Sequence, residues 1–402
     1  MAASSEHVAR TAPGHVTAAD ACPGILDLHE ARDGLVARIR LPGGYASPAR
    51  LRSLAALAGR FGDGRVDLTA RGNVQLRGIR AGSADGLARA AASAGLLPSP
   101  AHDRARNITA SPLAGLAGHR ELRDAVHALD TAILADPALA ALPGRFLFGL
   151  DDGTGRAGLG RCDLGLRLGP GGAELIVAGR GTARLGPAAG MIAVVVAAAR
   201  TFLSQRGSPP CTTRVSGLPD AGAALAAAAG GVPGDPVADA DTRLSLGPLA
   251  AAAGGVPGEP AVVVAAPLGR LTAPQLRLAA GLVCPGETAR LTAAGRIVLP
   301  LAGPAGAALT RLEAGGLIIN DDHELAAVTA CAGLACARSL ADVRSLAARV
   351  PGAGPVHWAG CDRRCGLPAD AAAVVATPAG RYELHDGPAR RTLSLAAPGR
   401  PA

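Results

Sequence analysis

Leu-Pro-Gly-Gly-Tyr-Ala-Ser-Pro-Ala-Arg-Leu, residues 41–51, has a counterpart later in this 402-residue chain: Pro-Leu-Gly-Arg-Leu-Thr-Ala-Pro-Gln-Leu-Arg, residues 267–277. Each copy continues into a helical stretch that begins at its proline. Each then reaches a strand-like stretch, Asp-Leu-Thr-Ala-Arg-Gly-Asn-Val-Gln-Leu (67–76) or Arg-Leu-Thr-Ala-Ala-Gly-Arg-Ile-Val-Leu (290–299). A strand, a helix and a strand make half of a ferredoxin-like module, so the chain is predicted to contain two such halves.

A second pair of segments follows the first. Asn-Ile-Thr-Ala-Ser-Pro-Leu (107–113) parallels Ala-Val-Thr-Ala-Cys-Ala-Gly (327–333), with Ser111 at the position of Cys331. Each half is therefore expected to hold a ferredoxin-like half-domain and a larger α/β domain. The predicted fold class is α+β with two pseudo-repeated halves.

The repeats also predict the domain boundaries. Residues 206–260 are rich in Pro, Gly and Ala, which is typical of a connection, and the two ends of the chain are expected to fray. The predicted units are a first ferredoxin-like half-domain (22–95), a first larger domain without cysteine ligands (100–205), the connection (206–260), a second ferredoxin-like half-domain (261–318) and a cysteine domain (319–395).

Two close cysteine pairs lie near the C-terminus, Cys331-x4-Cys336 and Cys361-x3-Cys365. Four thiolates that fold onto one point bind zinc or an iron–sulfur cluster, and the spacing alone leaves both open. Clustered thiols without a disulfide pattern indicate a reducing compartment. The other cysteines are isolated and are interpreted as small buried or neutral residues: Cys22, Cys162, Cys211 and Cys284.

Residues 66–77 predict a strand with one apolar face and one polar face. The polar face mixes amides with arginine, which suits hydrogen bonds to the carboxylates of a bound molecule, although an ordinary solvated strand face has the same pattern. Its side chains are Asp67, Thr69, Arg71, Asn73, Gln75 and Arg77. Arg104, Arg106, Asn107 and Arg145 are further candidates for the same pocket, and each taken alone is more often a surface group.

Composition limits the partners. The formal net charge of +8 and the pI of about 9.6 favour an anionic partner. Scattered arginines and 2% aromatic residues disfavour nucleic acid, whereas a polycarboxylate small molecule fits. The longest apolar run, 187–199, ends at Arg200 and is shorter than a membrane span, and the N-terminus lacks the pattern of a signal peptide. A cytoplasmic protein without a membrane or nucleic-acid partner is expected.

Together these motifs resemble the nitrite and sulfite reductase haemoprotein family, in the same order over residues 22–395. The resemblance rests on Leu-Pro-Gly-Gly, on Leu-Thr-Ala-Arg-Gly-Asn-Val-Gln-Leu-Arg-Gly-Ile (68–79), on Arg-Asn-Ile-Thr-Ala-Ser-Pro (106–112) and on the paired cysteines. Ala-Cys-Pro-Gly-Ile-Leu (21–26) and Ala-Cys-Ala-Gly-Leu-Ala-Cys-Ala (330–337) are similar to the oxygen-dependent biosynthetic branch of this family, in which a tetrapyrrole is the substrate.

The resemblance implies a [4Fe–4S] cluster and a set of site residues. Cys331, Cys336, Cys361 and Cys365 would ligate the cluster, while Arg71, Arg106 and Arg145 would serve the reaction. The implied substrate-binding residues are Thr69, Arg71, Asn73, Gln75, Arg77, Arg104, Arg106 and Asn107. The resemblance further implies O2 as a reactant, a mononuclear non-haem iron, and a ferredoxin or an NAD(P)H-linked reductase as electron donor. No two-His-one-carboxylate motif is visible for that iron.

Two departures from the family pattern affect the prediction. In the reductases two lysines follow the Leu-Pro motif, but here the positions are Arg145 and Leu147, which argues against a small oxyanion substrate. The first cysteine pair commonly has five intervening residues and here has four; in an α-helix that would turn a ligand by about 100°. The alternatives are a sirohaem-dependent nitrite or sulfite reductase and a zinc-binding protein without redox function.

Overall fold

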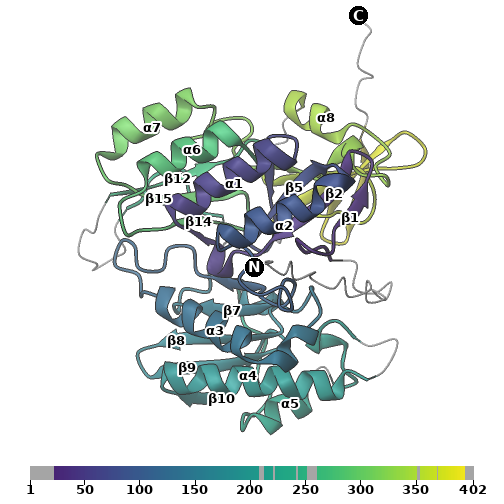
Figure 1. The fold of residues 1–402 in the computed structure, drawn as a ribbon. Helices are drawn as coiled ribbons and strands as arrows, with labels where there is room; N and C mark the ends of the chain where they lie inside the picture. The colour runs from purple at the N-terminus through teal and green to yellow at the C-terminus, as the bar shows by residue number, and fades with distance from the viewer. Residues whose placement is uncertain are drawn as a thin grey trace, which may run out of the picture.

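The computed structural model describes residues 22–207, 212–220, 222–240, 243–250, 260–350, 354–368 and 370–393. Four five-stranded sheets and the helices packed on them confirm the predicted α+β class (Figure 1). The predicted frayed ends and Cys211 lie outside these residues. Short 3-10 helices occur at η1 (Pro42–Gly44), η2 (Ala81–Ser83), η3 (Pro137–Ala141), η4 (Leu159–Arg161), η5 (Val215–Gly217) and η6 (Gly333–Ala335).

The first and second sheets are fully antiparallel, and the two halves of the chain exchange an edge strand between them. The first sheet contains β1 (His29–Ala31), β2 (Gly34–Ile39), β5 (Val74–Ile79), β4 (Arg65–Leu68) and β13 (Arg270–Thr272), in that order. The second contains β11 (Gly247–Pro248), β12 (Ala261–Ala265), β15 (Arg296–Pro300), β14 (Ala289–Leu291) and β3 (Tyr45–Ala46). β13 thus completes the sheet of the first half, and β3 that of the second.

Helices from both ferredoxin-like halves share one hydrophobic core. α1 (Pro48–Phe61) begins after Ser47, whose side chain accepts the Arg50 N–H. α6 (Ala273–Leu282) begins with a capping box between Thr272 and Gln275. α1 packs directly on α6, and α2 (Ala84–Ser93) and α7 (Ala305–Ala314) flank them (Figure 1). The helix starts therefore follow the prediction from Pro48 and Pro274.

The third and fourth sheets have the same strand order and the same directions, in which three parallel strands are followed by two antiparallel ones. The third contains β6 (Ile108–Ala110), β7 (Phe148–Asp151), β8 (Leu164–Gly169), β9 (Gly172–Val177) and β10 (Arg180–Gly186). The fourth contains β16 (Val328–Ala330), β17 (Val356–Ala359), β18 (Ala372–Ala376), β19 (Tyr382–Asp386) and β20 (Ala389–Leu393).

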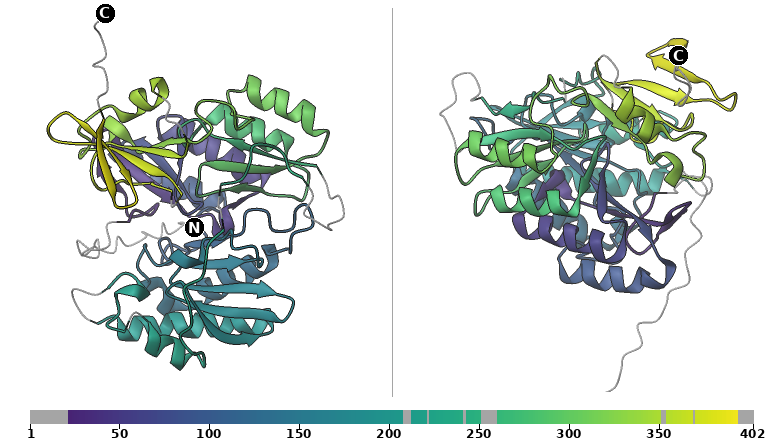
Figure 2. Two further views of the ribbon diagram at one scale, coloured as in Figure 1. Left: turned by 180° about the vertical axis from the view of Figure 1, so that it is seen from behind. Right: turned by 90° about the horizontal axis from the view of Figure 1, so that it is seen from above.

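Helices cover these two sheets as well. α3 (Arg123–Ala135), α4 (Ala188–Gln205) and α5 (Ala223–Ala228) pack on the third sheet and form its core with Phe146, Phe148 and Phe202. The fourth sheet has a smaller core around Trp358, covered by α8 (Val343–Arg349). In Figure 2 the fourth sheet, in yellow, lies beside the first sheet, and the third sheet lies apart below them.

The backbone also matches at the ends of the repeated strands. The Ser111 N–H donates to Leu150 O at 3.1 Å, and the Cys331 N–H donates to Trp358 O at 2.9 Å. The Asp152 N–H then donates to Ser111 Oγ at 3.1 Å, as the Gly360 N–H does to Cys331 Sγ at 3.2 Å. Ser111 and Cys331 thus occupy the same place in their two sheets.

The predicted strand over residues 66–77 is wrong, because these residues form a hairpin of β4 and β5. The Thr69 N–H donates to Asn73 O, and Gly72 turns the chain with a φ of +69°. The residue before Asn73 therefore has to adopt a left-handed conformation that glycine tolerates best. Residues 292–296 repeat the same turn, with Gly295 at a φ of +73°.

The apolar run at 187–199 and the connection at 206–260 both contain regular secondary structure. Among the described helices, α4 is the one whose length and apolar composition would allow a membrane span. Its Met191, Val195 and Phe202 are buried against the third sheet, so core packing explains its apolar character. Within residues 206–260, α5 packs on α4 and β9, and β11 joins the second sheet.

Candidate functional site

The amides of the predicted polar face hold the scaffold together. Asn73 is buried; its Oδ1 accepts the Leu41 N–H at 2.9 Å and its Nδ2 donates to Asn107 Oδ1 at 2.7 Å. Asn107 Nδ2 in turn donates to Phe146 O. Thr69 Oγ1 accepts the Asn73 N–H inside the turn. These side chains connect the first sheet to the third, and their polar atoms are engaged with the protein itself.

The arginines of the polar face divide into paired and clustered groups. Arg77 makes a two-pronged bond to Asp33 and also donates to Ala335 O at 3.1 Å, next to the first cysteine pair. Arg270 pairs with Asp67 across the two halves. The Gln75 side-chain oxygen accepts from Arg38. Arg71 donates to Gly144 O at 3.4 Å and is half-buried.

The candidates outside the hairpin are also placed differently from one another. Arg106 is buried and holds Asp130 with two bonds of 2.7 Å. Arg104 pairs with Asp27 at the surface. Arg145 is exposed, and Leu147 packs in an apolar cluster with Leu159 and Cys162. Of the three predicted catalytic arginines, the structure places Arg71 in a cluster of cations and commits Arg106 to a carboxylate.

Sequence reasoning missed most of that cation cluster. Arg38 and Arg40 lie beside Arg71, and the Cys22 sulfur lies between them. Burial lowers the pKa of Arg71 to about 10; Cys22 opposes that shift, and Arg214, Arg38 and Arg40 add to it. Two arginines two residues apart, Arg-Ile-Arg at 38–40, immediately before the Leu-Pro-Gly-Gly run were the available signal.

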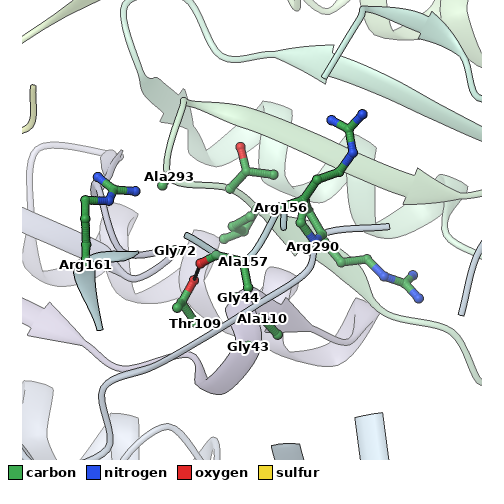
Figure 3. Close-up of a pocket in the computed structure, with 13 residues that line it drawn as sticks. Gly43, Gly44, Gly72, Thr109, Ala110, Arg156, Ala157, Arg161, Arg290 and Ala293 are labelled. Atoms are coloured by element: carbon green, nitrogen blue, oxygen red, sulfur yellow. Dashed lines mark hydrogen bonds between the residues drawn. The ribbon is translucent and has the colours of Figure 1, made fainter. Parts of the chain in front are cut away.

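A pocket next to this cluster is formed by three of the four sheet regions (Figure 3). About 440 Å³ of empty space, including open solvent at its mouth, lies within it. Its residues are Gly43, Gly44, Gly72, Thr109, Ala110, Pro112, Arg156, Ala157, Arg161, Arg290, Leu291, Thr292 and Ala293. Gly44 needs its missing side chain, because a Cβ there would lie 2.4 Å from Leu291 O.

The donors around the pocket suit an anionic ligand with several carboxylates. Arg290 is 1% exposed and its Nε lacks a hydrogen-bond partner within the described structure. Arg40 is buried in the same way, with Nε and Nη1 unpartnered. A buried guanidinium nitrogen without a partner is costly, and a carboxylate can accept from two such nitrogens with parallel bonds.

The four C-terminal cysteines lie in one neighbourhood at the end of the fourth sheet. Burial raises the pKa of the Cys365 thiol; Arg363 opposes this, and Cys361, Cys331 and Cys336 raise the pKa further. Cys331 Sγ accepts N–H groups from Gly333 at 3.4 Å and Gly360 at 3.2 Å. Backbone N–H groups directed at sulfur stabilise a thiolate, which is the form that binds metal.

The four neighbouring thiols can be compared with the ligands of two kinds of metal centre. Four thiolates on one zinc ion, with Zn–S of about 2.3 Å, approach one another to about 4 Å. A four-iron cluster binds one thiolate at each of its irons. Four neighbouring thiols are a donor set that suits either centre.

The shortened first cysteine pair does not lie on an α-helix. Cys331 follows β16, and Cys336 follows the 3-10 turn η6 in an extended conformation. The expected rotation of about 100° per residue applies to an α-helix and therefore does not apply to this pair. Arg77 and Arg32 fix the turn from the first half through Ala335 O.

Two basic side chains, the half-buried Arg344 and the buried His357, support the cysteine loops. Arg344 donates to the carbonyls of Ala330 and Cys331 at 3.2 and 3.1 Å. His357 lies between Thr329 Oγ1 at 2.9 Å and Cys365 O at 3.1 Å. Burial lowers the pKa of His357 to about 4, so its ring is neutral at pH 7. Both side chains hold backbone that carries a thiol.

The fold and the site together define an α+β protein with two equivalent halves, of which one holds a cysteine centre. Residues 29–94 match the model of the nitrite/sulfite reductase ferredoxin-like half domain. The chain is 34% identical over 157 residues to "Precorrin-3B synthase" of Sinorhizobium sp, covering 37% of this chain and 32% of that protein. It is 42% identical over 81 residues to "Ferredoxin--nitrite reductase" of Leptolyngbya laminosa, covering 20% of this chain and 16% of that protein.

Among solved structures, the NirA protein of Mycobacterium tuberculosis superposes with a TM-score of 0.68 at 19% identity, over 90% of this chain and 77% of that one. This likeness extends the shared fold from the matched half-domain to most of the chain. The sequence matches span about a third or less of the two curated relatives. Residues 29–94 are thus similar to the nitrite/sulfite reductase ferredoxin-like half domain, and most of the chain shares the fold of the NirA protein.

Proposed function

We propose that this chain hydroxylates precorrin-3A at C20 with O2 and closes a lactone from the ring A acetate, giving precorrin-3B in aerobic cobalamin (vitamin B12) biosynthesis. It would be an oxidoreductase that acts as a monooxygenase, in which one oxygen atom enters the product and the other leaves as water. The observation that carries the proposal is the 34% identity to a protein named precorrin-3B synthase.

The surroundings of Leu147 support the biosynthetic branch. A nitrite or sulfite site needs cations at the reacting oxyanion, because a small anion in a desolvated pocket requires compensation. Leu147 instead packs with Ala157, Leu159 and Ile176, where a cation would be buried among apolar side chains. The chain therefore lacks one of the two charges expected of a reductase.

The proposed reaction would use two groups of residues, one that binds the substrate and one that holds the cluster. Arg71, with Arg40 and Arg290 nearby, would bind and orient the carboxylates of the tetrapyrrole. Cys331, Cys336, Cys361 and Cys365 would hold a [4Fe–4S] cluster, which supplies electrons one at a time when bound. The described residues offer no ligand group for a mononuclear iron, so none is assigned. A ferredoxin or an NAD(P)H-linked reductase in the cytoplasm would be the electron donor.

A sirohaem-dependent nitrite or sulfite reductase is the second candidate. The 42% identity to a ferredoxin–nitrite reductase favours it over residues that both kinds of enzyme share. A zinc protein without redox function is the third candidate, because four neighbouring thiols are also a zinc donor set.

The absorption spectrum of the protein purified without oxygen, with iron and acid-labile sulfide measured on the same sample, separates the three candidates. The proposal predicts a broad iron–sulfur shoulder without macrocycle bands. Strong sirohaem bands would make the chain a reductase, and a colourless zinc protein would exclude both redox functions. Cys361→Ser should abolish the shoulder, and an intact shoulder in that variant would refute the cluster assignment.

The reaction itself is tested with precorrin-3A under ¹⁸O2. The product should gain one labelled oxygen atom, and turnover should require a reductant. Arg71→Ala should weaken tetrapyrrole binding and leave the iron–sulfur absorbance intact. Unchanged affinity would show that Arg71 does not bind the substrate, and product without label would refute the monooxygenase reaction.

A further inference from the structure

Cys22 lies where two arginines of the first sheet converge. Arg38, on β2, directs Nη1 at the Cys22 sulfur at 2.6 Å, and Arg40, just after β2, places Nη2 at 3.6 Å from it. Two guanidinium groups therefore face the same sulfur atom. Cys22 was interpreted from the sequence as an ordinary buried residue, and this geometry gives it a different role.

Arg40 provides an independent reason for an anion at this place. Its side chain is 2% exposed, and Nε and Nη1 have no hydrogen-bond partner within the described structure. The remaining nitrogen reaches the carbonyls of Pro23 and Gly144 at 3.5 Å, in addition to the sulfur. A buried cation requires a nearby negative charge, and carbonyl dipoles alone do not supply one.

Most of the charged groups around Cys22 are cations. Arg71 adds a third cation from the turn between β4 and β5. Asp103 faces Arg40, but its Oδ2 already accepts the N–H groups of Ile25 and Leu26. Arg104, next to Asp103, pairs with Asp27. Three guanidinium groups therefore face one sulfur and one carboxylate.

We propose that Cys22 is a thiolate in the folded protein and the reactive cysteine of this chain, a site that peroxides and soft electrophiles modify. Burial by itself would raise the pKa of Cys22, but Arg38, Arg40 and Arg71 outweigh it and hold the pKa below the ordinary value. The thiolate, not the thiol, is the nucleophile, so this environment makes the sulfur reactive at neutral pH.

Hydrogen peroxide would oxidise the Cys22 thiolate. The sulfur attacks one peroxide oxygen, a sulfur–oxygen bond forms, the oxygen–oxygen bond breaks and hydroxide leaves. Sulfur is oxidised by two electrons to a sulfenic acid, and the peroxide is reduced. The sulfenic acid can lose its proton to the hydroxide, so the product stays an anion among the same arginines.

The test is the pH dependence of alkylation of the full-length protein by iodoacetamide between pH 5 and 10. Peptide mass spectrometry then reads the adduct at each cysteine. The rate at Cys22 should rise with a midpoint clearly below the value of about 8.5 for a free cysteine. A midpoint at or above 8.5 would overturn the proposal, whatever the variants show.

Arg38→Gln and Arg40→Gln test the cause. Each substitution should move the midpoint of alkylation to higher pH. For each pH unit of that shift, alkylation at pH 6.5 should slow by about tenfold, while the rate at pH 10 is retained. An unchanged midpoint in both variants would show that access to the sulfur, rather than charge, sets its reactivity.

Cys162 is the internal control. It is buried, and burial together with Asp163 raises the pKa of its thiol. Cys162 should stay unmodified at neutral pH in every sample, and its labelling in a variant would reveal loosening of the fold rather than a change of pKa. After equimolar peroxide, a 1,3-diketone reagent should label Cys22 and not Cys162. Absence of that label at Cys22 would refute reaction with peroxide.

Discussion

Arg106→Met should destabilise the protein and leave tetrapyrrole binding nearly unchanged. The Arg106 guanidinium is 5% exposed and holds Asp130, 13% exposed, with two bonds of 2.7 Å. Removal of one partner of a buried ion pair leaves an uncompensated charge, which costs about 3–5 kcal/mol. Arg50 lies within electrostatic reach of both groups and remains in the variant, so we expect the lower end, about 3 kcal/mol.

Urea denaturation read by hydrogen exchange of α3, which carries Asp130, measures this loss locally. Arg104→Met is the matched control, because Arg104 and Asp27 are 30% and 49% exposed and such pairs contribute at most about 1 kcal/mol. If Arg106→Met loses less than the control variant, or weakens tetrapyrrole binding while its stability is retained, the reasoning is refuted. Arg106 would then be a ligand-binding residue, as the sequence suggested.

Two further predictions concern buried side chains. His357 has a pKa lowered to about 4 by burial, so the unfolded chain binds a proton between pH 6.5 and 4 that the folded chain does not. The contribution of His357 to the free energy of unfolding should therefore be full above pH 6.5 and fall by up to about 3 kcal/mol toward pH 4. His357→Gln should flatten this pH dependence, which urea titrations at several pH values measure. An equal slope in the variant would contradict the prediction. Asn73→Ala leaves the Leu41 N–H and Asn107 Oδ1 unpaired, so it should lower the free energy of unfolding by about 2–4 kcal/mol. The urea midpoint measures this loss, and tetrapyrrole affinity should be retained. Lost affinity at unchanged stability would show that Asn73 binds the ligand.

The architecture was predictable because the repeats carry it. Pro48 and Pro274 start helices in both halves, and the match of Ser111 with Cys331 holds at the level of single hydrogen bonds. The exchange of β3 and β13 between the halves was not predictable, because strands of two or three residues have no periodicity of their own.

The hairpin was missed for a different reason. A hairpin conserves the alternation of the two faces across its turn, since Asp67 pairs with Gln75 and Val66 with Leu76. The pattern of period two therefore continues through the turn, and Gly72 was the remaining signal of it. The candidate site suffers from a similar limit. Sequence spacing shows which arginines exist, but the partner of each, such as Asp130 for Arg106, is set by tertiary packing.

The difference between the two halves at the cysteine position leads to a last prediction. Where the second half has Ala359 and Gly360, the first half has Asp151 and Asp152, and the Asp151 carboxylate accepts from Ser111 Oγ and from the backbone of the loop that follows. The first half thus places a hydrogen-bonded carboxylate where the second half has the methyl group of Ala359. Position 360 has no room for a side chain, because a Cβ there would lie 1.9 Å from Ser339 Oγ and 2.9 Å from Ser339 Cβ.

Gly360→Ala should therefore displace the turn that leads into Cys361. Rotation of the Ser339 hydroxyl relieves only the first clash, since the Ser339 Cβ and Cα remain in the way, so we expect a cost of about 1–3 kcal/mol. The shift would also remove the Gly360 N–H from Cys331 Sγ and lower the iron and sulfide bound per chain. Gly303→Ala is the matched control, because no atom lies within 4 Å of its Cβ position. Equal stability and equal iron in the two variants would show that the backbone between Trp358 and Cys361 is not held in place by close packing on Ser339.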